Sequence, residues 1–257
     1  MVRHPFCSTA DVADPAAALN PAVVVTRAIG LDSNLVLFFT RSNLMTVNVN
    51  LSQVLHLAPN TRSSYRAAFQ NGQTVLDQHK ISETPLRVAH FMAQVLHESG
   101  GLAIQFENLN YSAERLPKVW PSRFKPRGPL DPDNYAHNPQ KLANEVYGGR
   151  MGNTAPNDGF TYRGRGLMQL TGKDSYREAT TILRKENPAA PDFVALPDQV
   201  ISAEWCLAVA ASEWVSKGCN ALADLDDIRK ITRAINGGLT GLAERIEWAR
   251  RTKAVWR

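Results

Sequence analysis

The sequence predicts a mainly α-helical domain, and three observations carry this prediction. From Leu51 onward, apolar side chains recur at the three- and four-residue spacing of amphipathic helices. Proline and glycine residues interrupt this pattern at intervals suited to ending one helix and starting another. The hydrophobic content of 44% is sufficient for a packed core in a chain of 257 residues.

The first 44 residues differ from the rest of the chain. They contain short apolar runs separated by turn-forming residues and no motif, so we expect an N-terminal extension of unknown role at 1–44 and the folded domain at 45–257. Arg27, Asp32 and Asn34 interrupt the apolar stretch from 22 to 39, which argues against a signal peptide. No apolar run approaches the roughly 20 residues of a membrane-spanning helix.

The helical pattern begins with one helix from Leu51 to about Pro59 and a second over residues 65–78. The next helix carries more information. Thr84 is suited to cap its N-terminus, Pro85 to occupy its first position, and Gly100 and Gly101 to end it.

Glu98 lies near the end of this third helix, on the face defined by apolar residues at 88, 91, 92 and 95. A carboxyl group on such a face is unusual. We expect it to point towards the core, where loss of solvation favours the protonated form.

Loops and further helices follow. Five prolines in residues 102–135 favour the wall of a cleft, and six glycines in 148–166 favour a loop that allows close backbone approach to a ligand. Helices are expected at 202–217, 224–235 and 241–257. The last carries five basic residues, interpreted as a solvated face or as a contact for an anionic cell envelope: Arg245, Arg250, Arg251, Lys253 and Arg257.

Two carboxylates point to acid–base chemistry. Glycoside hydrolysis needs one acid to protonate the leaving oxygen and a second carboxylate to activate water or to attack the sugar. Glu98 on an apolar face suits the first role, and Glu107, in a polar loop nine residues later, suits the second. The Gly100–Gly101 break between them allows the two side chains to face each other across a groove.

Four motifs in order resemble the family 19 glycoside hydrolases. They are His97-Glu98-Ser99-Gly100-Gly101, the segment from Glu107 to Tyr111, the segment from Tyr162 to Gly172, and the segment from Ile231 to Gly238. The resemblance covers about residues 51–257 and implies a mainly α, lysozyme-like domain with two lobes around a substrate cleft. It implies no metal and no organic cofactor. The short spacing between the glutamates is similar to the bacteriophage endolysin branch.

The resemblance also implies roles for individual residues. Glu98 matches the general acid, Glu107 the general base of an inverting displacement, and Thr171 the hydroxyl that holds the attacking water. The residues that we expect to bind substrate are those at matching motif positions and an arginine near the acid pair: Gln169, Asn236, Asn110, Tyr111, Tyr162 and Arg245.

The predicted function is therefore that of an endolysin that hydrolyses β-1,4 bonds of bacterial peptidoglycan, as a muramidase. The net charge of +5 favours approach to anionic wall polymers, whereas the scattered basic residues argue against nucleic acid. We expect a monomer that stays in the host bacterial cytoplasm until its release to the wall. Three cysteines, an odd number, argue against a disulfide framework, and Cys206 is expected to be a buried thiol.

Several alternatives remain open. A chitinase would act on a polymer that shares the N-acetylglucosamine unit. A lytic transglycosylase would use a single acid, although some 65 residues separate Glu98-Ser99 from the Gly-Leu-Met-Gln stretch here. A non-catalytic wall-binding protein would keep only the fold. A zinc hydrolase is excluded because Gly101 stands where the His-Glu-x-x-His pattern requires its second histidine.

Overall fold

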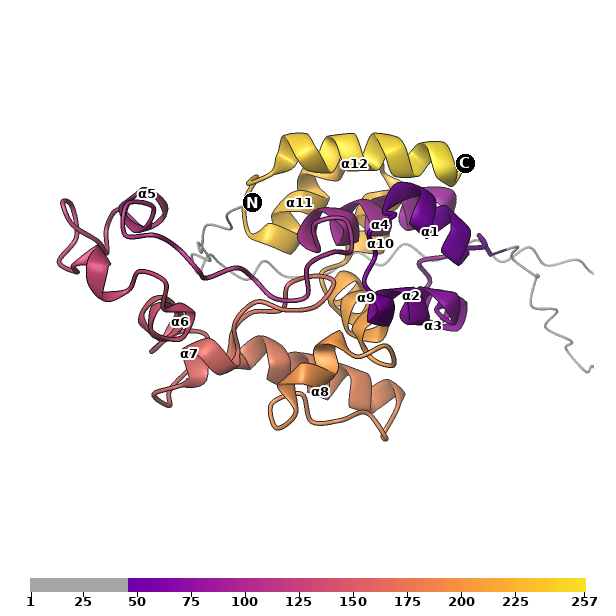
Figure 1. Cartoon of the computed structure of the whole chain (residues 1–257). Coiled ribbons are helices and arrows are strands. Elements are labelled where there is room, and N and C mark those ends of the chain that lie inside the picture. Colours follow the sequence, from indigo (N-terminus) through magenta and orange to yellow (C-terminus); the bar gives the residue numbers. More distant parts are fainter. Residues whose placement is uncertain (1–45) are drawn as a thin grey trace, which may run out of the picture.

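The computed structural model describes residues 46–257, so the expected N-terminal extension at 1–44 lies outside the described residues. Helices supply most of the regular structure, and the β pairing in this part of the chain consists of isolated bridges. The helices (Figure 1) are α1 (Leu51–Leu57), α2 (Ser63–Gln70), α3 (Gln73–Gln78), α4 (Pro85–Glu98), α5 (Leu116–Val119), α6 (Pro139–Tyr147), α7 (Asp158–Thr161), α8 (Lys173–Glu186), α9 (Cys206–Ser216), α10 (Cys219–Asp224), α11 (Ile228–Asn236) and α12 (Leu242–Val255), with 3-10 turns at Pro132–Asn134 and Pro197–Ile201.

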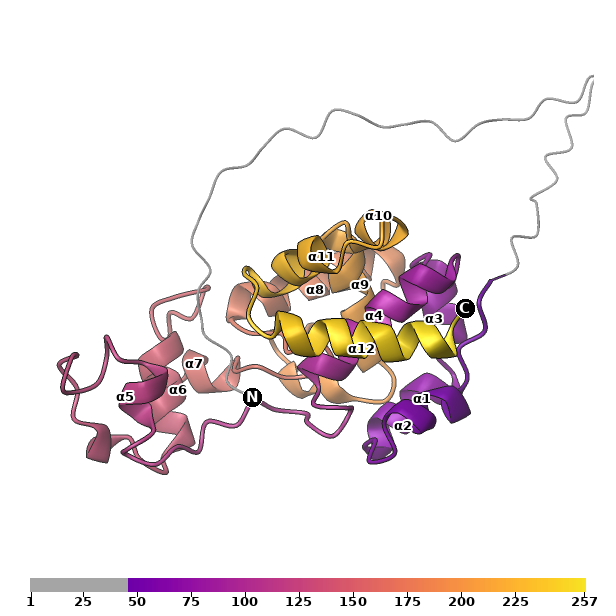
Figure 2. The same ribbon diagram turned by 90° about the horizontal axis from the view of Figure 1, so that it is seen from above.

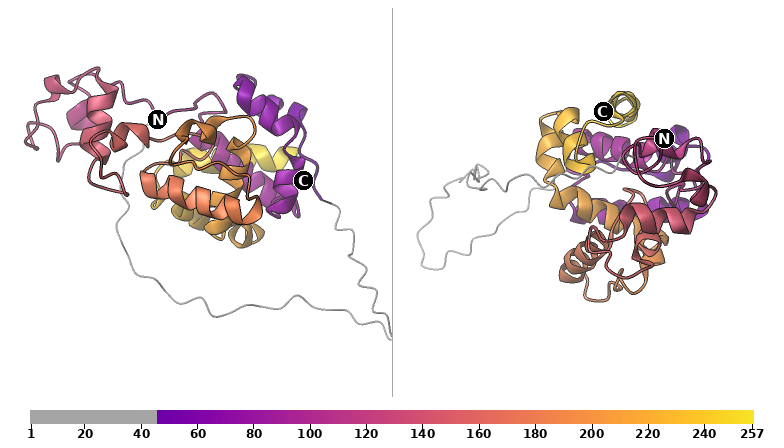
Figure 3. Two further views of the ribbon diagram at one scale, coloured as in Figure 1. Left: turned by 90° about the horizontal axis from the view of Figure 1, so that it is seen from below. Right: turned by 90° about the vertical axis from the view of Figure 1, so that its left-hand side faces the viewer.

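The described chain forms two lobes, as predicted. Helices α5, α6 and α7 gather in a small lobe, residues 108–161, that is set apart from the main lobe formed by the other helices (Figures 2 and 3). The small lobe has its own apolar cluster, which includes Leu116, Phe124 and Leu142. The main lobe contains two further clusters, one around α4 and α9 and one between α8 and α9.

Helix α4 lies at the centre of the main lobe, and its predicted limits are confirmed. The Thr84 side chain accepts a hydrogen bond from the Arg87 backbone N–H at 3.2 Å, and Pro85 occupies the first helical position. The helix ends at Glu98. Helix α12 packs along α4, and the Thr252 hydroxyl reaches the Ala89 carbonyl oxygen at 2.8 Å. Glu98 is therefore carried on a helix whose side chains are mostly buried.

Three predicted helices have different limits in the structure. The helix expected at 224–235 is α11, which starts only at Ile228 because α10 occupies the chain up to Asp224. Residues 65–78 were expected to form one helix, but Gly72 separates α2 from α3. A Cβ atom at Gly72 would lie 2.4 Å from Leu207 Cδ2, so the break allows close packing against α9. Helix α9 starts at Cys206 and not near 202, because the Ser202 hydroxyl accepts a hydrogen bond from the Trp205 N–H at 3.2 Å and forms a turn instead. Cys206 is a buried free thiol, as predicted, and burial raises its pKa to about 12.

Helix α12 lacks the fully solvated basic face that its sequence predicts. Arg245 is only 1% exposed and points into the protein. Arg250 forms an ion pair with Glu247 at 2.7 Å, and Lys253 pairs with Asp226. Most of the positive charge is thus already balanced within the protein, which weakens the expected contact with an anionic envelope. None of the helices in residues 46–257 is both long and apolar enough to cross a membrane.

The burial of His90 on α4 predicts a folding stability that depends on pH. Its side chain is fully buried, its Nε2 lies 2.6 Å from Asp226 Oδ1, and its Nδ1 has no hydrogen-bond partner among the described residues. Burial lowers the pKa of His90 below 6.5, although the Asp226 carboxylate opposes this shift. On acidification the unfolded chain binds a proton that the folded protein does not bind, so stability is present above pH 6.5 and is lost as the pH falls towards the folded pKa.

We therefore expect the melting temperature of the wild type to fall between about pH 8 and pH 5 by more than that of His90→Gln. Glutamine keeps an N–H donor for Asp226 but does not titrate. Thermal unfolding at a series of pH values measures both proteins, and identical pH dependence would show that another group is responsible.

Candidate active site

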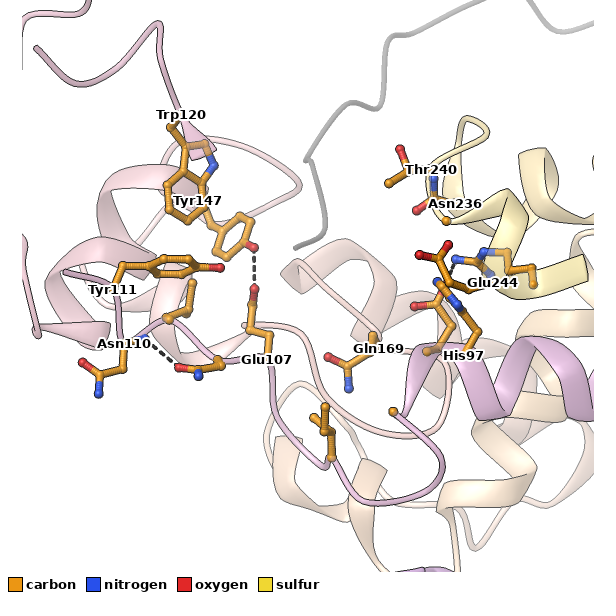
Figure 4. Close-up of a pocket in the computed structure, with 17 residues that line it drawn as sticks. His97, Glu107, Asn110, Tyr111, Trp120, Tyr147, Gln169, Asn236, Thr240 and Glu244 are labelled. Atoms are coloured by element: carbon orange, nitrogen blue, oxygen red, sulfur yellow. Dashed lines mark hydrogen bonds and ion pairs between the residues drawn. The ribbon is translucent and has the colours of Figure 1, made fainter. Parts of the chain in front are cut away.

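A cavity that is lined by both predicted acids, Glu98 and Glu107, lies between the two lobes and has a volume of about 470 Å³. Such a volume is typical of a small-ligand site. The main lobe contributes one wall, with side chains from the end of α4, from the end of α11 and from the start of α12. The small lobe contributes the other (Figure 4). The lining residues include His97, Glu98, Gln169, Asn236, Glu244 and Arg245 on the main lobe, and Glu107, Asn110, Tyr111, Trp120 and Tyr147 on the other side.

Glu107 is positioned by backbone pairing between two loops. The segment around Phe106 bridges Arg165 in antiparallel sense, and the Glu107 N–H donates to the Gly164 carbonyl oxygen at 2.9 Å. Its carboxylate is also held. The Gly164 N–H donates to Oε1 at 2.5 Å, and the Tyr147 hydroxyl donates to Oε2 at 2.6 Å (Figure 4). Both oxygens therefore accept hydrogen bonds, which suits an ionised carboxylate.

Gly164 brings three predicted site residues close together. A Cβ atom at this position would lie 3.1 Å from Thr171 Oγ1, 3.3 Å from Gln169 Oε1 and 3.3 Å from the Glu107 carboxyl carbon. Only glycine allows the three side chains to converge without displacement. The glycine-rich stretch was expected to let the backbone come close to a ligand. At Gly164 the close neighbours in the structure are protein side chains.

Glu98 lies on the opposite wall, and its surroundings differ from the sequence-based expectation. The Arg245 guanidinium donates from Nη2 to Glu98 Oε1 at 2.6 Å, and the two side chains are only 1% and 2% exposed. Arg245 also donates to the Gln94 side chain. The Glu98 carboxyl group therefore faces a cation in addition to apolar neighbours, so the purely apolar environment that was expected is wrong.

Arg245 lines the cavity and also contacts the predicted acid. Although it borders the pocket, its side chain is directed between Gln94 and Glu98 on α4. Burial lowers the pKa of Arg245 to about 10, while the charge of Glu244 acts in the opposite direction. The guanidinium remains protonated at neutral pH. Its contacts indicate a residue that orients Glu98, and because Arg245 also lines the cavity its contact with substrate stays a prediction.

The other predicted substrate-binding residues divide into two groups. Gln169, Asn236, Asn110 and Tyr111 all line the cavity. Tyr162 does not. It is 6% exposed in the cluster between α8 and α9, where its ring packs edge-on against Tyr176 and its hydroxyl donates to the Val194 carbonyl oxygen at 3.0 Å. Tyr162 is therefore a core residue that supports the Glu107-binding loop from behind.

Several lining residues were not predicted from the sequence. Tyr147 holds Glu107 although the two are 40 residues apart, and no local pattern marks it. Trp120 and Glu244 also line the cavity. His97 is adjacent to Glu98, and a Cβ atom at Gly241 would lie 2.6 Å from its ring. Among residues 46–257 no group of three His, Cys, Asp or Glu side chains is arranged to hold a metal ion.

Replacing Thr171 with alanine should weaken turnover without abolishing it. The Thr171 hydroxyl donates to the Gln169 carbonyl oxygen at 2.8 Å, which leaves its oxygen lone pairs free to accept from a water near Glu107. Its loss removes one orienting contact while both acids remain. We expect a smaller decrease than the roughly 10²–10⁴-fold associated with losing an acid or base. Steady-state kinetics compare Thr171→Ala with Thr171→Ser, which should stay near wild type; equal losses in both would assign the effect to packing.

The helical, two-lobed architecture with its interlobe cavity defines a lysozyme-like glycosidase fold. A bacterial family 19 chitinase superposes with a TM-score of 0.54 at 21% identity, over 81% of this chain and 94% of that protein. Chitinase C from Streptomyces griseus HUT6037 gives 0.51 at 17% identity, over 81% and 92%. These similarities show the fold.

Sequence similarity shows the family. A glycosyl hydrolase family 19 domain-containing protein from Haemophilus influenzae is 38% identical over 162 residues, which are 62% of this chain and 75% of that protein. No protein-family profile matches the chain. The chain belongs to glycoside hydrolase family 19, and it is accordingly a hydrolase of O-glycosyl bonds.

Proposed function

We propose that this enzyme is an endolysin that hydrolyses β-1,4 bonds of bacterial peptidoglycan as an inverting muramidase, with residues 45–257 as its catalytic domain. An endolysin acts on the wall from within the host cell, after release from the cytoplasm. The observation that carries the proposal is that Glu98, at the end of α4, and Glu107, beside the small lobe, line one cavity. Each carboxyl group is also held by named donors, so their orientations are fixed before substrate binds.

In the proposed mechanism the Glu98 carboxylate, which is paired with Arg245 in the free enzyme, takes up a proton from solvent and delivers it to the leaving glycosidic oxygen. Glu107 removes a proton from a water that attacks the anomeric carbon from the opposite face. The C–O bond to the leaving sugar breaks as the bond to water forms. Inversion requires a separation of about 6.5–9.5 Å between the carboxyl groups, which leaves room for that water. Thr171 orients the water, and Arg245 keeps Glu98 in position.

A chitinase is the second candidate, and it is favoured by the two chitinases that superpose on this chain. Two features of this chain favour peptidoglycan. Glu107 follows Glu98 by only nine positions, a spacing that resembles the endolysin branch, and the net charge of +5 suits anionic wall polymers. The two substrates share a sugar unit, so the cavity itself is compatible with both.

Mass spectrometry of fragments released from purified peptidoglycan, with chitin as the parallel substrate, tests the proposal. We expect soluble fragments from peptidoglycan that end in a reducing N-acetylmuramic acid. Release from chitin alone would establish the chitinase. An anhydro-sugar end would identify a lytic transglycosylase, and binding to the wall without any fragments would indicate a non-catalytic protein.

A further inference from the structure

A second groove adjoins the candidate active site at Gly100. This stem groove, as we call it, lies between the ends of α1 and α4 and the middle of α12 and has a volume of about 370 Å³. Gly100 lines both the stem groove and the interlobe cavity. The two sites also meet at a pair of consecutive residues: Ala103 lines the groove, and Ile104, which is 41% exposed, lines the cavity. A ligand bound in the cavity would therefore have a side branch within reach of the groove.

The loop that separates the two sites is firmly held. The Leu102 N–H donates to the Ser99 hydroxyl oxygen at 2.9 Å, and Leu102 adopts a φ of 62°, which is uncommon for a residue other than glycine. The Arg62 N–H donates to the Leu102 carbonyl oxygen at 3.0 Å, and Arg62 Nε donates to that of Ala103 at 2.9 Å. These hydrogen bonds fix the backbone of the loop at residues 102 and 103. The groove wall is thus preformed.

The chemistry of the stem groove differs from that of the cavity. Its lining is mainly apolar side chains and glycine, with Asn60 as a neutral polar residue, and none of the described residues that line it is acidic. Two guanidinium groups contact residues of this lining. Arg251 lies 4.2 Å above the Trp248 ring and donates to the Leu57 carbonyl oxygen at 3.1 Å, and Arg62 contacts Ala103. The cavity, in contrast, contains the carboxylates of Glu98, Glu107 and Glu244. The groove therefore suits a ligand with small apolar groups and a negative charge.

We propose that the stem groove binds the peptide stem of the peptidoglycan strand whose glycan lies in the cavity. This inference rests on the proposed function, because chitin carries no such branch. A stem peptide has alanine methyl groups, which gain from contact with Trp248 and Ala103, and free carboxylates, which are attracted by Arg62 and Arg251. The groove would then contribute to the affinity for peptide-bearing glycan without taking part in bond cleavage.

The test compares intact peptidoglycan sacculi with the same sacculi after an amidase has removed the stems. Ala103→Phe fills the groove, and Ala189→Phe adds the same bulk at an exposed loop position that lines neither site. We expect Ala103→Phe to raise KM about tenfold on intact sacculi, the scale on which pocket contacts discriminate. On stripped sacculi KM should stay within about twofold, as it should for Ala189→Phe on both substrates.

Trp248→Ala tests the same groove by removing its largest side chain, with Ile246→Ala as the control on the same helix, where Ile246 is 47% exposed. Melting temperatures identify any variant that fails to fold, in which case Ala103→Phe decides. Equal changes on intact and stripped sacculi, or no change on either, would overturn the stem-binding role while leaving the proposed function intact. Failure of the wild type to cut either form, with cleavage of chitin, would refute the endolysin function and the stem groove together.

Discussion

Glu107→Gln is expected to fold like the wild type and to lose roughly 10²–10⁴-fold in turnover, the typical contribution of a general base. The fold should survive because glutamine reproduces the two contacts of the carboxylate: its carbonyl oxygen accepts from the Gly164 N–H, and its NH₂ group donates to the Tyr147 hydroxyl oxygen. Activity should not survive, because an amide does not take a proton from water. Release of soluble fragments from peptidoglycan measures the loss.

The matched control for this variant is Glu145→Gln. Glu145 also lies in the small lobe and also accepts a hydrogen bond from a tyrosine, Tyr135, at 3.3 Å, but it does not line the cavity. It should keep wild-type turnover. Near-normal activity of Glu107→Gln would rule out the two-carboxylate mechanism, whatever the control shows.

Arg245→Met should cost about 3–5 kcal/mol of unfolding free energy, because it leaves the buried Glu98 carboxylate without its cation. Both side chains are almost completely buried, so solvent does not screen the pair. The variant should also lose activity, since Glu98 is no longer held towards the substrate. Urea unfolding and turnover measure the two effects separately.

The double variant Glu98→Gln/Arg245→Met distinguishes the ion pair from simple packing. If the cost arises from an unpaired buried charge, removing that charge should restore part of the stability, so the two single effects should not add. Additive losses would show that Arg245 acts mainly through the contacts of its aliphatic stem and its bond to Gln94.

Local signals in the sequence predicted much of the fold. Thr84, Pro85 and the glycines after Glu98 define α4 through short-range capping physics, and the structure agrees with these limits. Residues 65–78 were misjudged because Gly72 breaks the helix to fit against Leu207, a tertiary contact that no helical period contains. The two lobes followed from the family resemblance, because helical periodicity does not indicate how helices group in space.

Site residues that share a short motif could be predicted from the sequence. Contacts between site residues that lie far apart in the sequence could not. Glu98 was found by its place on an apolar helix face and Glu107 by its polar loop and motif, but the Arg245 contact with Glu98 spans 147 positions and the Tyr147 contact with Glu107 spans 40. Tyr162 shows the opposite error. It shares a motif with Thr171, yet its side chain turns into the core. Motif membership places a backbone segment at a site, whereas side-chain direction depends on packing.

The stereochemistry of the first-formed product tests the central claim most directly. Proton NMR recorded during the first minutes of hydrolysis, before mutarotation, reports the configuration at the new anomeric carbon. Attack by a water held between Glu107 and the sugar predicts the α-anomer, with inversion from the β-linked substrate. A β-anomer would require a covalent intermediate or its equivalent and would contradict water-mediated catalysis across the cavity between Glu98 and Glu107.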